Sequence, residues 1–265
     1  MNKDTRVVRM TAVLLFVVFC VVACGGGKSN IPSKNGYPLQ SREQAVIDAV
    51  LKNESDAFLE DGDTMLFDGI LPVLASEVSA EYDKNEVSAD QKYFKKSLLV
   101  TGRVLSVNSG LGNKPYVVLR ASNQLLGPQI HFEKKNNISR IASLEKGERA
   151  SFVCVAGGAI VGTPMFEECS FADDYAAKKV AETKSQVIAY LSGKNIKSES
   201  VKKLAIVAIA LARVLPDSST CFSTGKIRAE ELEAIGDEAL KREISSVSLE
   251  LRSHGVDVPD LKASN

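Results

Sequence analysis

The side chains best suited to chemistry are five cysteines and two histidines, but their spacing fits no catalytic or metal site. No two cysteines are separated by two residues, the spacing that zinc sites and redox motifs commonly use. His131 and His254 are far apart in the sequence, and neither has a nucleophile at a recognisable spacing. The glycine runs at 25–27 and 157–158 lack the Gly-Lys-Ser/Thr of a phosphate loop. We therefore expect a protein that is not an enzyme, with no catalytic residues, no metal and no cofactor.

The first 24 residues have the layout of an export signal. Three basic residues lie among the first nine, and an uncharged, mostly apolar run of fourteen residues follows from Met10 to Ala23. A membrane-spanning helix needs about 20 residues, so this run is too short to be a good permanent span. The sequence Val21-Val22-Ala23-Cys24 resembles the bacterial lipobox, in which the cysteine is acylated and the chain is cleaved before it. We predict a signal peptide over 1–23 and lipidation of Cys24; the alternative is an ordinary secretory signal.

A lipidated Cys24 would hold the protein on a membrane, outside the cytoplasm. A cysteine that carries three acyl chains, one of them expected to be palmitate, anchors a protein stably in a membrane, whereas a single acyl chain binds only marginally. Residue 25 is Gly, not the Asp that keeps many enterobacterial lipoproteins in the inner membrane. We therefore expect the outer rather than the inner membrane, with the protein facing the periplasm or the cell surface. Residues 24–40 are rich in Gly, Ser, Asn and Pro, which predicts a flexible tether.

Charge is unevenly distributed along the chain. Residues 41–91 contain three basic and thirteen acidic residues, whereas residues 92–172 contain eleven basic and five acidic ones. Such segments either pack against each other or present two solvated faces. Without the signal peptide the chain has 30 basic and 32 acidic residues. Its net charge therefore does not indicate a protein whose whole surface binds nucleic acid.

Helices are predicted on both sides of a central β-rich segment. Ser41 and Gln44 have the spacing of a capping box, which predicts a first helix in the acidic helical segment 41–92. Helical patterns return in the C-terminal region 173–265, where an apolar run ends before Pro216 and predicts the centre of a small bundle. The five expected helices cover about 42–60, 76–92, 175–191, 198–215 and 229–253.

The central segment, residues 93–172, has the pattern of a small β-barrel. Its expected strands cover 98–107, 116–119, 129–132, 150–156 and 165–171, with a short helix at 137–144. The resulting order, β-β-β-α-β-β, is that of an OB-fold, a five-stranded Greek-key barrel with a helix between its third and fourth strands. We therefore predict an α+β protein, an OB-fold barrel flanked by N-terminal helices and a C-terminal helical bundle.

Several motifs in this part of the chain resemble those of one family. They are EYDKNEVSADQKY at 81–93, VTGRV at 100–104, Lys146-Gly147, and the cysteines Cys154 and Cys169. Together they resemble the tRNA anticodon-binding-like OB-fold family of bacterial envelope proteins and lipoproteins, over residues of about 76–172. The sequence departs from the family pattern at Lys95-Lys96, where a Lys-Gly-Lys turn is common. The resemblance implies a fold rather than an activity.

Cys154 and Cys169 fall in the last two predicted strands. If these strands form an antiparallel hairpin in which paired residue numbers sum to 323, Cys154 faces Cys169 and Phe152 faces Phe171. We therefore predict a disulfide, which would contribute about 3 kcal/mol by restricting the unfolded chain. Two buried free thiols are the alternative. Cys221, in a predicted loop, is expected to be unpaired and partly buried.

The predicted barrel also has a basic surface that could hold a ligand. OB-folds often bind single-stranded nucleic acid with aromatic platforms and a basic groove, but most aromatic residues here are needed for the core. An envelope location also removes most nucleic-acid ligands, so we do not expect nucleic acid to be the partner. The residues of the predicted ligand face are Lys95, Lys96, Arg103, Arg120, Lys134 and Lys135.

These features predict a lipid-anchored envelope protein without catalytic activity. Its partners would be the membrane, through the N-terminal lipid, and another envelope component, expected to be a protein, for which it serves as a binding or scaffolding module. The alternative is an OB-fold module that binds an anionic polymer, nucleic acid or glycan, through the basic face.

Overall fold

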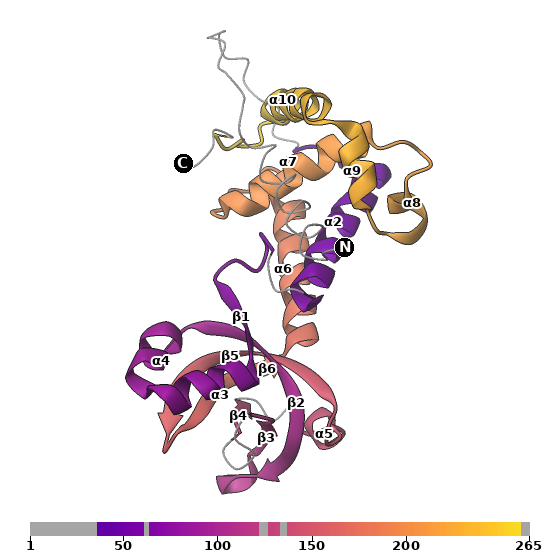
Figure 1. Cartoon of the computed structure of the whole chain (residues 1–265). Helices are drawn as coiled ribbons and strands as arrows, with labels where there is room; N and C mark the ends of the chain where they lie inside the picture. Colours follow the sequence, from indigo (N-terminus) through magenta and orange to yellow (C-terminus); the bar gives the residue numbers. More distant parts are fainter. Residues whose placement is uncertain (1–35, 61–63, 122–126, 133–136, 261–265) are drawn as a thin grey trace. The chain divides into compact units, whose positions relative to one another are not determined.

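The computed structural model describes residues 36–60, 64–121, 127–132 and 137–260, which form two compact units (Figure 1). The barrel unit comprises Ala57–Lys178, and the helical unit comprises the described residues up to Asp56 and from Lys179 onward. The predicted signal peptide and Cys24 lie outside the described residues, as do Lys134 and Lys135.

The barrel unit contains the predicted OB-type barrel, so the predicted fold class is confirmed. Its strands have the order β1-β2-β3-β4-β6-β5, and an additional pairing of β2 with β5 closes the last five into a barrel. Alternate residues of each strand point inward, where they form one apolar core. The strands are β1 (Ile70–Leu74), β2 (Ser97–Ser109), β3 (Pro115–Leu119), β4 (Gln129–Phe132), β5 (Arg149–Ile160) and β6 (Thr163–Phe171).

Strand β1 was not predicted from the sequence. It runs parallel to the first half of β2, with Ile70 opposite Ser97 and Leu74 opposite Thr101. Its central residue, Pro72, cannot donate a ladder hydrogen bond. Proline is tolerated here because β1 pairs only with β2 and is an edge strand.

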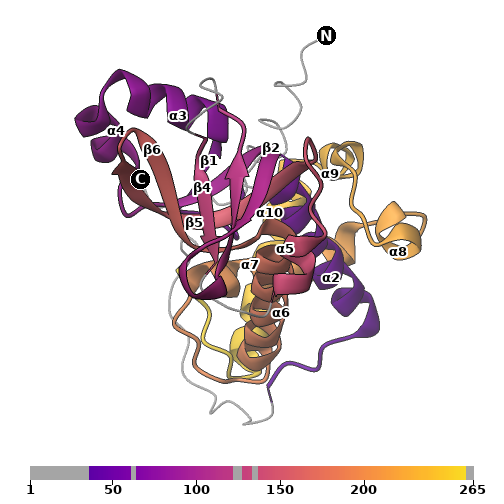
Figure 2. The ribbon, with the colours of Figure 1, turned by 90° about the horizontal axis from the view of Figure 1, so that it is seen from below.

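The single helix predicted over 76–92 is two helices, α3 (Ala75–Lys84) and α4 (Glu86–Tyr93). Asn85 between them has an extended backbone, and its side chain accepts a hydrogen bond from the Ser88 backbone N–H. Asparagine is a favoured N-cap, so it ends one helix and starts the next. These helices lie against the barrel strands, and α5 (Ile138–Ala142) follows β4 as predicted (Figure 2).

The helical unit is built from residues 41–56 of α2 (Ser41–Glu60), residues 179–191 of α6 (Ala172–Leu191), and four further helices. These are α7 (Glu199–Val214), α8 (Thr220–Thr224), α9 (Ala229–Ile235) and α10 (Asp237–Ser253). The helix predicted over 229–253 is therefore two, because Gly236 has a positive φ of 73° and interrupts it. Cys221 lies in α8 rather than in a loop.

The first described residues already belong to the helical unit. Tyr37 is buried, and its backbone N–H donates to the Leu191 carbonyl. Gly36 has a φ of +64°, and a Cβ there would lie 2.8 Å from the Cα of Ser192. Residues 36–40 are thus part of the folded unit, whereas the tether was predicted to continue to Gln40. None of the helices in the described residues combines the length and apolar character needed to cross a bilayer.

The grouping of segments differs from the linear division drawn from the sequence. Residues 41–56, which we assigned to an acidic N-terminal segment, belong with the C-terminal helices. Contacts distant in the sequence account for this: Arg42 donates to the carbonyls of Ala212 and Leu215, and Asn53 donates to that of Ile227. The helices α3 and α4 belong to the barrel unit instead.

Candidate binding face of the barrel

The outer side of β3 and β4 presents two aromatic rings. On β3, Val117 and Leu119 point into the core, which leaves Tyr116 on the outside; on β4, Ile130 is buried and His131 points outward. Tyr116 and His131 are directly opposite each other in the antiparallel β3–β4 ladder. Their rings are stacked, with centroids 5.1 Å apart and planes 14° from parallel.

The surroundings of the ring pair set the protonation of His131. Burial lowers the pKa of His131, and the negative charge of Glu167 on β6 opposes that effect. The Nε2 atom of His131 shares a hydrogen bond of 3.1 Å with the Gln129 side chain. The imidazole is therefore held in place beside Tyr116, and its neutral form is favoured.

Polar side chains border the rings. Asn108 of β2 is opposite Tyr116, and its amide donates to the Ser106 hydroxyl over 2.9 Å. On the other side, Gln129 is opposite Met165 of β6. We call the outward residues Ser106, Asn108, Tyr116, Gln129 and His131 the ring face. Such a surface can stack a planar or apolar group and donate and accept hydrogen bonds at its border.

The ring face contains no arrangement of a nucleophile, a base and an orienting group. The described residues also include no group of three or more His, Cys, Asp or Glu side chains that could hold a metal ion. What the ring face offers is ring stacking and hydrogen bonding. Sequence reasoning treated His131 as a lone histidine and did not single out Tyr116. The apolar alternation around Val117 and Ile130 places both side chains on the outside of their strands, but it does not give the register that makes them neighbours.

The structure brings together two of the four described members of the predicted ligand face. The backbone N–H of Arg120 donates to the Arg103 carbonyl over 2.7 Å, so these two arginines are neighbours. Lys95 and Lys96 precede β2 instead, at least seven residues before Arg103, which is about 23 Å along an extended chain at 3.3 Å per residue. The Nζ of Lys95 lies 5.3 Å from the centre of the Phe94 ring.

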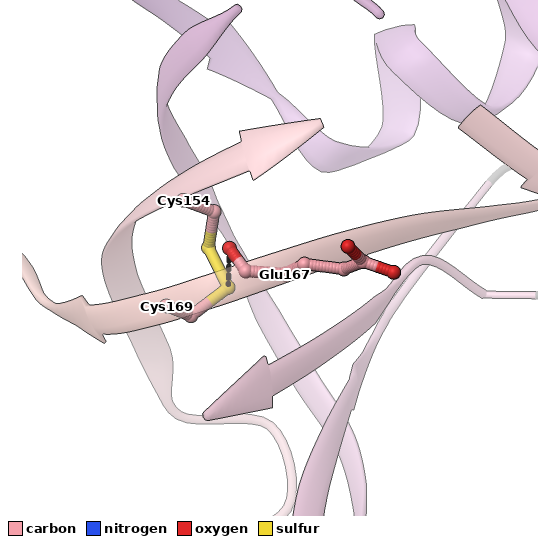
Figure 3. Close-up of a disulfide and its surroundings, with 3 residues drawn as sticks. All are labelled: Cys154, Glu167 and Cys169. Atoms are coloured by element: carbon pink, nitrogen blue, oxygen red, sulfur yellow. Dashed lines mark hydrogen bonds between the residues drawn. A yellow bond between two sulfur atoms is a disulfide. The ribbon is translucent and has the colours of Figure 1, made fainter. Parts of the chain in front are cut away.

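The predicted cysteine pair is bonded in the structure. The Sγ atoms of Cys154 and Cys169 are 2.09 Å apart, and the bond joins β5 to β6 (Figure 3). The predicted register holds at Phe152, which is opposite Phe171. Figure 3 also shows the Cys169 sulfur next to the Glu167 carbonyl oxygen, at 3.6 Å. Both cysteines are buried in the barrel core, where the bond joins the last two strands of the barrel.

The free cysteine, Cys221, belongs to the helical unit. Cys221 is buried in α8, and its sulfur is 4.0 Å from the Ala45 carbonyl oxygen. Burial raises the pKa of the Cys221 thiol, which disfavours the reactive thiolate.

The comparison with protein families decides what kind of barrel this is. The model of the family described as tRNA_anti-like matches residues 1–170, more than half of the chain. The chain belongs to the tRNA_anti-like family. The tRNA_anti-like match ends one residue before the end of β6, so helices α6 to α10 lie beyond it.

Comparisons with other collections of proteins add little to the tRNA_anti-like match. Among curated proteins, no match was found. One similar solved structure is described as the "crystal structure of putative nucleic acid-binding lipoprotein from Klebsiella pneumoniae subsp. pneumoniae MGH 78578". It is 16% identical, with a TM-score of 0.31, over 38% of this chain and 91% of that chain.

Proposed function

We propose that this OB-fold protein is anchored by a lipid on Cys24 in the bacterial envelope and binds another envelope component through the ring face. The observation that carries the proposal is the stacked pair of Tyr116 and His131 on the outside of β3 and β4. The phenylalanines of β4, β5 and β6 are buried in the core, whereas these two rings are partly exposed. Tyrosine is enriched where proteins bind one another, because its ring provides a large contact area at a low entropic cost.

Two features support the proposed location. The first 24 residues resemble a lipoprotein signal, and the Cys154–Cys169 disulfide is of the kind that persists in oxidising compartments such as the periplasm. The proposed role is binding or scaffolding without catalysis, because the ring face offers stacking and hydrogen bonds but no paired acid and base.

The proposed binding role can be tested in intact cells with a photo-crosslinking residue in place of Tyr116. We expect it to capture one envelope component, and we expect His131→Ala in the same chain to reduce the yield by at least fivefold. A matched control carries the crosslinker at Val87 of α4, which is 71% exposed. Equal capture from positions 116 and 87 would show that the ring face has no specific partner.

The proposed anchor has a separate test. Replacing Cys24→Ser should abolish incorporation of labelled palmitate and move the protein from the membrane fraction to the soluble fraction. A variant that stays acylated and membrane-bound would contradict lipidation at Cys24. Neither result depends on the ring face.

The alternative function, binding of an anionic polymer through the six-residue basic face, receives less support. Of the described members, Arg103 and Arg120 are neighbours, whereas Lys95 and Lys96 are separated from them by the first half of β2. A continuous basic groove over these four side chains is therefore not present.

A further inference from the structure

Three arginines form a row across neighbouring strands of the barrel. Arg103 of β2 is directly opposite Arg149, the first residue of β5. On its other side, Arg103 accepts a backbone hydrogen bond from Arg120, which directly follows β3. We call Arg149, Arg103 and Arg120 the arginine row. Sequence reasoning missed Arg149 as a member, because nothing in the sequence alone gave the register between β2 and β5.

All three side chains of the arginine row point away from the barrel core. Val104 and Leu119, which are adjacent in sequence to Arg103 and Arg120, are fully buried on the inside. On the outside of β2 and β5 the cross-strand pairs are Leu99 with Val153, Thr101 with Ser151, and then Arg103 with Arg149. The first pair is covered by apolar residues, whereas all three arginines are exposed.

No acidic side chain of the described residues forms an ion pair with the arginine row. Glu148, the nearest acid to Arg149 in sequence, instead accepts from the backbone N–H of Glu145 over 2.9 Å. Arg103 donates to the Gly147 carbonyl over 2.8 Å, which orients one arm of its guanidinium group. In the same unit, Arg140 shows the opposite behaviour and pairs with Asp173 and Asp174 at 2.6 and 2.8 Å.

Like charges at directly opposed positions of a sheet destabilise it. Three arginines at neighbouring backbone positions, with no carboxylate paired to them among the described residues, therefore raise the free energy of the unliganded barrel, and a bound anion would relieve this repulsion. We propose that the arginine row binds a phosphate group. A single arginine satisfies a carboxylate with two parallel hydrogen bonds, whereas a phosphate group has more oxygens and more charge to engage several arginines at once.

The proposed phosphate site does not rely on the ring face or on the lipid anchor. It uses the first residue of β5, the middle of β2 and the residue that follows β3, and none of its residues belongs to the ring face. The phosphate could be free in solution or part of a lipid headgroup, and the experiment below uses one probe for each source.

The test uses the full chain in detergent and calorimetric titration with inorganic pyrophosphate and with dihexanoyl phosphatidic acid. We expect Arg103→Gln and Arg149→Gln each to weaken binding of at least one probe by tenfold or more. Arg149→Lys should show an intermediate loss of affinity, because lysine keeps the positive charge but cannot form the bidentate hydrogen bonds of a guanidinium group. The control, Lys96→Gln, removes the same charge from the same unit and should change affinity less than twofold.

Thermal unfolding provides a second measurement on the same variants. At low salt, Arg149→Gln without any ligand should melt at or above the wild-type temperature, because a repulsive charge is removed. Pyrophosphate or phosphatidic acid should raise the melting temperature of the wild type and not that of Arg149→Gln. Tighter binding of phosphatidic acid would identify a lipid headgroup, and tighter binding of pyrophosphate a free phosphate. The proposal is overturned if neither probe binds, or if the arginine variants bind as tightly as Lys96→Gln.

Discussion

The two units use their charged side chains differently. In the helical unit, Arg213 contacts Glu243, Glu250 and the hydroxyl of Tyr37, and Tyr37 in turn donates to the carboxylate of Glu43, which is only 3% exposed. Burial, together with the bond to Glu43, raises the pKa of Tyr37 to about 12. In the barrel unit, the arginine row has no such partners among the described residues. The Arg213 network fixes the chain of the helical unit, whereas the arginine row leaves its charge available for the proposed phosphate.

The units also differ in how their cysteines are used. The barrel unit contains the buried Cys154–Cys169 disulfide, which joins its last two strands. The helical unit has Cys221, a buried free thiol, and is held by packing and ion pairs instead. Reducing conditions should therefore affect one unit and not the other.

The largest expected effect comes from removing the disulfide. The double variant Cys154→Ala/Cys169→Ala should lower the free energy of unfolding of the barrel unit by about 3 kcal/mol, the usual contribution of a bond that closes a loop of this length. Hydrogen exchange read by mass spectrometry in increasing urea would report each unit separately. We expect faster exchange in β5 and β6 and unchanged exchange in α7 and α10. Equal destabilisation of α7 and α10 would show that the units do not unfold independently.

The next effect concerns the ion network of the helical unit. Arg213→Leu should lower its free energy of unfolding by about 2 kcal/mol, because Glu43 stays buried while the nearby positive charge is lost. Arg242→Leu, at an exposed position of α10, removes the same charge and should cost less than about 0.5 kcal/mol. The same urea experiment measures both. If the two variants are equally stable, the network does not fix residues 36–40 to the helices.

A smaller change should stabilise the barrel. Val161 at the β5–β6 turn has a φ of +50°, a conformation that is unfavourable for a β-branched residue. The next residue, Gly162, has a φ of +75°. Two-residue turns with both φ values positive favour Asn-Gly. Val161→Asn should therefore raise the free energy of unfolding by about 1 kcal/mol. Ile160→Asn, at a neighbouring exposed position without a positive φ, should give no gain in thermal denaturation.

The sequence predicted most of the barrel because its signals are local. The alternation of apolar residues gave five strands, and the numbers of two cysteines and two phenylalanines gave the register of the last two. The edge strand at Ile70–Leu74 was missed because its proline is tolerated only at an edge, which is a property of the assembled sheet. The breaks at Asn85 and Gly236 were missed because the apolar pattern continues across them.

The candidate sites were harder to predict than the fold. Which arginines belong to the arginine row depends on the pairing of β2 with β5, whose paired residues are 46 to 58 positions apart in the sequence. The stacking of Tyr116 and His131 depends on the β3–β4 register, across a connection whose turn chemistry does not fix it. Residue type alone therefore identified the charges but not which of them are neighbours.

The smallest effect is a pH dependence that belongs to the ring face. Burial lowers the pKa of His131, so the unfolded chain takes up a proton more readily than the folded one. The free energy of unfolding should therefore fall as the pH decreases through about 6.5, the ordinary histidine value, and stop falling below the lowered pKa of the folded state. His131→Gln removes this contribution, so the variant should lose less stability than the wild type between pH 7.5 and 5.5 in urea denaturation. If both proteins lose the same stability, burial does not keep His131 neutral beside Tyr116. The ring face would then tolerate a positive charge, as the exposed arginine row does.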